Sequence, residues 1–122
     1  MKEVLKYIKE QLQGIGINYA FLRWNKEIVY PYFVGTYNKP EGTIESQYHE
    51  TTFTLEGFTV GSWDKLEEAR DQIETLFEDN RTTLPSGTGV VITYAGDFPI
   101  PIDEGELKRI QINLKIKEWR VR

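Results

Sequence analysis

The sequence predicts a single α+β domain over residues 1–122, in which a four-stranded, mainly antiparallel sheet carries two helices on one face in the order α-β-β-α-β-β. The strongest observation lies in residues 107–121, where an isoleucine or leucine occupies every second position from Ile110 to Ile116. This alternation is typical of a strand with one buried face. Two other segments show helical spacing, and the predicted strands are joined in pairs without a helix, which favours antiparallel hairpins.

The two helices are predicted from apolar residues that recur every three or four positions. The first covers residues 3–13 and ends at the glycines that follow. The second begins at Ser62 or Asp64 and ends near Phe77. Asp64 and Glu67 have the spacing of a capping box, so we expect them to satisfy the first backbone amides of this helix.

The remaining strands are predicted from β-branched and aromatic residues. Residues 32–37 form one strand, and residues 19–24 are extended in the same block. Residues 48–61 form a long second strand, with a bulge expected at Gly57 where the apolar phase changes. Residues 90–94 form a short apolar strand before the final one.

The connections are predicted from proline, glycine and polar residues. Residues 38–47 and 95–106 are long and polar, and we expect both to be mobile in the isolated protein. Residues 78–89 contain Asn80, Pro85 and two glycines, and we expect them to end the second helix and lead into the next strand.

The composition sets the class of protein. The chain is 39% hydrophobic and 13% aromatic, which is enough for one compact core. It contains no cysteine, so a disulfide framework and a thiolate metal site are excluded. Charges interrupt the apolar residues near the start of the chain, so we expect neither a signal peptide nor a membrane span. The net charge of −4 favours neither tight nor sequence-specific binding of DNA.

The sequence indicates no catalytic residues, no cofactor and no metal site. His49 is the single histidine, and on a strand it points to the face opposite Glu50. No second histidine or cysteine completes a transition-metal site. The acidic residues near Asp97 do not match the spacing of a calcium-binding loop. The residues by themselves therefore leave an enzyme possible but give no support for one.

Two groups of residues are candidates for a protein interface. Aromatic residues are concentrated in the first third of the chain, and tyrosine combines a large contact area with a polar tip. The alternative is that these rings fill the core. Cations gather on the polar side of the last strand, and the alternative there is a solvated face. The candidates are Tyr30, Tyr32, Tyr37, Arg109, Lys115 and Lys117.

The order of elements resembles the tail-terminator (tail-completion, head-tail joining) proteins of long-tailed bacteriophages over nearly the whole chain. The motifs that carry the resemblance are Tyr30-Pro31-Tyr32 at the start of a strand, the threonine-rich strand at Thr52 to Leu55, and the helix motif from Leu66 to Ala69. The long acidic segment 97–106 departs from the family pattern.

The resemblance implies a non-enzymatic virion protein, assembled in the bacterial cytoplasm. Such proteins form a ring, commonly hexameric, that caps the tail tube, joins it to the neck of the head and lets DNA pass without binding it specifically. A ring needs two different surfaces on each subunit. Acidic residues of the second helix, such as Glu67 and Asp71, are candidate partners for the cations of the last strand.

Two other functions fit the residues. One is a small cytosolic ligand-binding or enzymatic α+β domain, with a pocket between the helices and the sheet. The other is a host protein that remodels nucleic acid through the basic face of the last strand.

Overall fold

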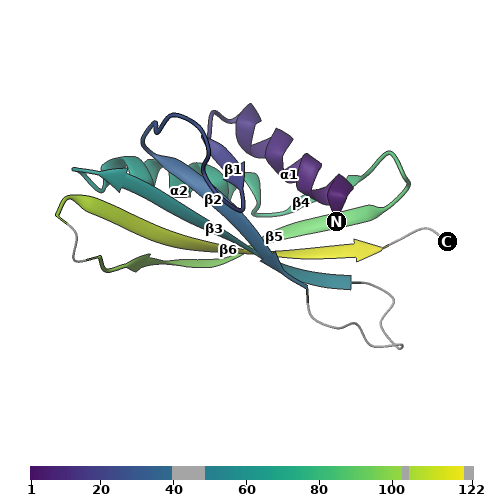
Figure 1. Ribbon diagram of the computed structural model, residues 1–122. Coiled ribbons are helices and arrows are strands. Elements are labelled where there is room, and N and C mark those ends of the chain that lie inside the picture. Colours follow the sequence, from purple (N-terminus) through teal and green to yellow (C-terminus); the bar gives the residue numbers. More distant parts are fainter. Residues whose placement is uncertain (40–48, 103–104, 120–122) are drawn as a thin grey trace.

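The computed structural model describes residues 1–39, 49–102 and 105–119, which form a six-stranded mixed sheet that curls into a half-barrel with both helices on one face (Figure 1). The strand order is β1-β2-β3-β6-β5-β4. The elements are α1 (Lys2–Gly14), β1 (Tyr19–Phe21), β2 (Tyr32–Asn38), β3 (His49–Val60), α2 (Asp64–Leu76), β4 (Asn80–Thr83), β5 (Gly89–Ile100) and β6 (Leu107–Trp119).

The long antiparallel pair of β3 and β6 forms the centre of the sheet. Its register is continuous from His49 opposite Glu118 to Val60 opposite Leu107. Phe53 pairs with Leu114, and both are fully buried. Because successive side chains point to opposite faces, this register places one apolar row against the helices and leaves the polar row on the other face.

The helices bury their apolar sides against the covered face of the sheet. The hydroxyl of Tyr7 in α1 donates to the Asn80 side chain in β4, and the Asn80 amide donates to Gln11 at 3.3 Å. Helix α1 therefore contacts β1 at one edge of the sheet and is bonded to β4 at the other. The buried helical residues are Val4, Ile8, Leu12, Leu66, Ala69 and Ile73.

Two glycines let aromatic rings lie flat against the sheet. A Cβ atom on Gly57 would lie 2.3 Å from the fully buried ring of Phe33, and one on Gly35 would lie 2.6 Å from the ring of Phe53. Real Cβ atoms do not approach other atoms so closely, so these positions require glycine.

The expected four-stranded, mainly antiparallel sheet is wrong, because the sheet has six strands and is mixed. Strand β1 has only three residues and pairs in parallel with β2, so residues 19–38 do not form a hairpin. Residues 80–83, expected to be loop, form β4 and pair with β5. Backbone pairing overrides the weak strand propensity of this Asn-Arg-Thr-Thr segment.

The bulge and the loop predicted for the second and third of the expected strands also lie elsewhere in the structure. Register shifts between Tyr94 and Asp97, where Gly96 has φ of 105°, so the bulge lies in β5. β5 continues to Ile100, so the predicted loop 95–106 is strand in its first half. No bulge occurs at Gly57 within the described strand β3, because Phe58 simply points to the uncovered face.

The start of α2 differs from the expected capping box. The Glu67 carboxylate accepts a hydrogen bond from the Trp63 indole at 2.8 Å instead of from a backbone amide. Ser62 accepts from the Asp64 amide at 3.1 Å. The expectation for residues 38–47 lies outside the described residues from residue 40 onward. Neither helix in the described part of the chain is long and apolar enough to cross a membrane.

The substitution Leu114→Asp tests the buried row of β6. It places an unpaired charge in the core, so we expect it to lower the free energy of unfolding by more than about 3 kcal/mol. Urea unfolding measures the loss. Thr52→Asp, at an exposed position of β3, is the matched control and should unfold at nearly the wild-type urea concentration. Similar midpoints for both variants would contradict the assignment of the two faces.

The substitution Gly57→Ala tests the packing of Phe33 against the sheet. The added methyl group forces a buried ring to move, so we expect a loss of about 1–3 kcal/mol in the free energy of unfolding. Gly89→Ala is the control, because a Cβ atom there has no neighbour closer than 4.0 Å. Equal stability of the two variants would show that the ring does not need this glycine.

Candidate interaction surfaces

The face of the sheet opposite the helices carries an aromatic patch, which we define as Trp24, Tyr30, Tyr32, Phe58 and Arg109. The Tyr32 ring centre lies 4.9 Å from that of Trp24, 5.8 Å from that of Tyr30 and 5.1 Å from that of Phe58. The Arg109 guanidinium lies 5.5 Å from the centre of the Phe58 ring. Register explains the cluster, because Tyr32, Phe58 and Arg109 are paired across β2, β3 and β6.

The cations of this face have partners within the sheet. Arg109 forms an ion pair with Glu56, and Lys115 lies 3.6 Å from Glu50. Replacing Arg109 and Lys115 by glutamate would be the simplest charge reversal to test whether this face is an interface. It would, however, place carboxylates opposite the carboxylates of Glu56 and Glu50 within the subunit. It does not make a clean test of an interface, because it also removes contacts within the subunit.

The structure brings together only part of the predicted interface set. Tyr30, Tyr32 and Arg109 meet in the aromatic patch, whereas Tyr37 points to the other face and stacks on Phe21 at 6.0 Å. Lys117 lies eight residues from Arg109, about 27 Å along β6. Glu67 and Asp71 are on α2, away from the uncovered face.

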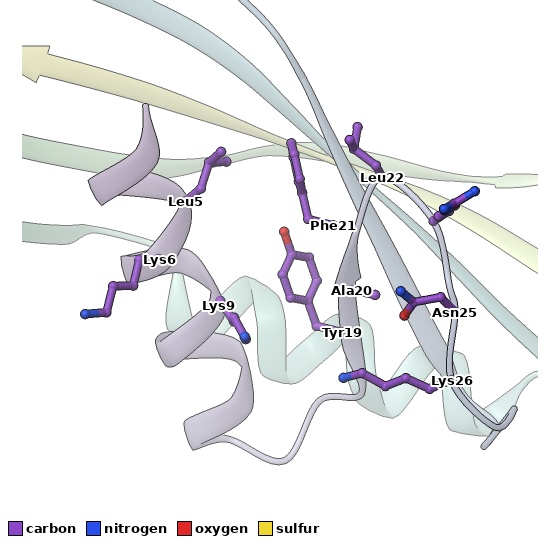
Figure 2. Close-up of a pocket in the computed structure, with 10 residues that line it drawn as sticks. Leu5, Lys6, Lys9, Tyr19, Ala20, Phe21, Leu22, Asn25 and Lys26 are labelled. Atoms are coloured by element: carbon purple, nitrogen blue, oxygen red, sulfur yellow. The ribbon is translucent and has the colours of Figure 1, made fainter.

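A groove of about 750 Å³ separates α1 from β1 and the loop that follows it (Figure 2). Four cations line it, and the described lining contains no carboxylate. Figure 2 shows that Lys9 from α1 and Lys26 from the loop extend toward one another. We call this the basic groove; its charged residues are Lys6, Lys9, Arg23 and Lys26.

The basic groove was missed in the sequence because its cations come from two segments that meet only in the fold. The spacing of Lys2, Lys6 and Lys9 along one side of the first helix is the signal that could have indicated half of it. The other half, Arg23 and Lys26, lies in a loop whose path follows from the parallel pairing of β1.

Arg70 on α2 is surrounded by four carboxylates, which we call the acidic cluster. Its guanidinium lies 3.2 Å from each of Glu67, Glu74 and Asp97 and also pairs with Asp71. One positive charge among four negative ones leaves three negative charges. Burial and the hydrogen bond to Asp97 raise the pKa of Tyr94, whose hydroxyl remains protonated and donates to that carboxylate.

The remaining titratable candidates do not converge. His49 begins β3 and is exposed, and Glu50 pairs with Lys115 on the other face. Among the residues that the structure describes, no group of three histidine or acidic side chains is placed to hold a metal ion.

Comparison with known proteins adds no relative, because no family model matches the chain and no curated protein is similar to it in sequence.

The phenol of Tyr19, which lines the basic groove, gives a test of burial. Its hydroxyl is buried and has no hydrogen-bond partner among the described residues. Removing an unsatisfied hydroxyl relieves a desolvation cost, so Tyr19→Phe should raise the free energy of unfolding by about 1 kcal/mol near neutral pH. Urea unfolding measures this, with Tyr37→Phe as the exposed control.

The same substitution should change the response to alkali. Burial raises the pKa of Tyr19 in the folded state above its usual value of 10.0. Below that value both states are protonated; as pH rises above it, only the unfolded state ionises readily and stability is lost. Tyr19→Phe should therefore lose less stability between about pH 7 and pH 11 than wild type. An equal loss in both proteins would place this hydroxyl in contact with solvent.

Proposed function

We propose that the chain is a non-enzymatic subunit of a ring that caps the tail tube of a long-tailed bacteriophage and joins it to the head. The aromatic patch is the observation that carries the proposal. Tryptophan, tyrosine and arginine are the residues most enriched at the centres of protein interfaces, and the patch contains all three. Tyr32, Phe58 and Arg109 lie on the uncovered face of the sheet, because their neighbours along the strands, Phe33, Thr59 and Ile110, are buried under the helices.

The sequence resemblance supplies the part of the proposal that concerns the tail. The Tyr30-Pro31-Tyr32 motif contributes two of its residues to the aromatic patch. The threonine-rich motif lies in β3, and Leu66 and Ala69, the two ends of the helix motif, are buried residues of α2. A hexamer is the ring size that the resemblance implies. The tail-tube and head-neck proteins would be its partners, within a virion assembled in the host cytoplasm.

The charge of the chain is compatible with a ring through which DNA passes. A subunit with a net charge of −4 does not attract phosphate over a long range. Arg109 and Lys115 of the uncovered face are paired with Glu56 and Glu50, which lowers their attraction for DNA further.

A ligand-binding domain is the second candidate, and the basic groove favours it. Its volume and its four cations would suit an anionic small molecule. The two functions differ in mass, because a ring has one discrete high mass and a ligand-binding domain does not require one. Native mass spectrometry of the wild-type protein separates them.

The double substitution Tyr32→Ala with Phe58→Ala tests the aromatic patch. Loss of two anchor side chains should weaken assembly at least tenfold, since each such residue contributes about 1–2 kcal/mol or more to binding. Native mass spectrometry measures the assembly, and circular dichroism verifies the fold. Trp119→Ala, an exposed aromatic at the far end of the same face, is the control and should assemble normally.

The same substitutions, introduced into the gene in the phage genome, test whether the protein terminates the tail. Loss of assembly should yield heads without tails and tubes of uncontrolled length, because nothing then stops the tail tube from adding further subunits. Electron microscopy of the lysate measures both. Uniform tails joined to heads in a strain that lacks the protein would eliminate the proposed function.

A further inference from the structure

The basic groove holds positive charges that lack a counter-charge within the described chain. Lys9 and Lys26 extend toward one another across it, and none of its four cations has an ion pair among the described residues. Like charges that face each other repel, and an anion between them removes this cost. The groove is therefore built to receive negative charge.

The acidic cluster on α2 has the opposite imbalance. Its carboxylates share one guanidinium, and those of Glu67, Asp71 and Glu74 are 46%, 64% and 48% exposed. A helix that presents such side chains on one side can be seated between two cationic walls without unfolding either partner.

The two charged surfaces do not overlap. The basic groove lies at the β1 edge of the sheet, and the acidic cluster is tied through Asp97 to β5, with β2, β3 and β6 between them. Contact between two different surfaces of identical subunits is heterologous, and it closes into a ring when the rotation permits.

We propose that the basic groove binds the acidic cluster of a second copy of this chain, and that this contact links neighbouring subunits. The inference rests on the proposed function and names the subunit contact within the ring. In this contact Lys9 and Lys26 bind the carboxylates of the second copy, and Arg23 and Lys6 lie beside them. The apolar side chains of Leu5 and Phe21 also line the groove. In this contact they pack against the aliphatic parts of the acidic side chains of the second copy's α2.

A second copy fits the groove better than a nucleic acid does. A nucleic acid carries a negative charge along its whole length, so the chain's net charge of −4 opposes its approach more than that of a second copy, whose total charge is only −4. The acidic cluster instead offers three net negative charges at one place, and every subunit provides one cluster for each groove.

The double substitution Lys9→Glu with Lys26→Glu tests the contact in the full chain. We expect the ring to dissociate, with assembly weakened at least tenfold in sedimentation and native mass spectrometry. The control is Lys2→Glu with Lys39→Glu, which changes the net charge equally at positions outside the groove and should assemble as wild type. Assembly of the wild type should also weaken as salt is raised.

A charge exchange makes the test specific. Asp71→Lys with Glu74→Lys should also prevent assembly, because it repels the intact groove. Circular dichroism verifies the fold of this variant, since the new lysines also lie beside Arg70. Combining all four substitutions in one chain should restore the ring, since each reversed surface then meets its complement. Failure of the folded fourfold variant to assemble would overturn the contact.

The outcomes separate the contact from the proposed function. A wild-type ring that persists in the Lys9→Glu, Lys26→Glu variant overturns the contact and leaves the proposed function standing. A wild-type protein that stays monomeric at every concentration overturns both. Binding of inorganic phosphate in the groove, with assembly unaffected by the substitutions, would assign the groove to a small anion.

Discussion

The long pairing of β3 with β6 is the constraint on which the rest of the structure depends. It runs from His49 to Val60 without a break in register, and a shift by one residue would turn every apolar side chain to the wrong face. The helices pack on the side that holds Phe53 and Leu114. The same register places Phe58 beside Arg109 on the other side. Core and candidate interface are therefore two faces of one pairing.

Two glycines next to this pairing allow aromatic rings to pack closely on the sheet. Gly35 leaves space for the rings of Phe53 and Tyr19, and Gly57 leaves space for the ring of Phe33. Helix α1 spans the half-barrel and is bonded to Asn80 in β4. The basic groove lies at the other edge of the sheet, between α1, β1 and the loop that follows β1.

Local patterns in the sequence were enough to predict the central elements. The alternation in residues 107–121 found β6, and the helical spacing found both helices within a few residues. The parallel pairing of β1 with β2 could not be predicted, because it depends on the path of the loop between them, which the residues do not show. The four-residue β4 depends on backbone hydrogen bonds to β5 that its polar side chains do not reveal. The second half of β5 was also not predicted, because the bulge at Gly96 interrupts the register and with it the alternation along the strand.

The candidate surfaces, like the fold, could be predicted only in part from the sequence. Tyr30 and Tyr32 were recognisable as neighbours in sequence, and the alternation in β6 placed Arg109 on the polar face. Their meeting with Phe58 required the register between strands. The aromatic density of the first third did not distinguish Tyr37, which the strand directs to the opposite face. The basic groove combines residues from helix α1 and from a separate loop, so no single segment of the sequence indicates the whole of it.

The claim that these surfaces are contacts between subunits is tested most directly by an electron-microscopy reconstruction of the protein at assembling concentration. The account predicts a closed ring in which Lys9 and Lys26 of each subunit contact Asp71 and Glu74 of the next, with the aromatic patch of each subunit covered within the ring. A reconstruction of single subunits, or of two-fold dimers with the basic groove open to solvent, would contradict it.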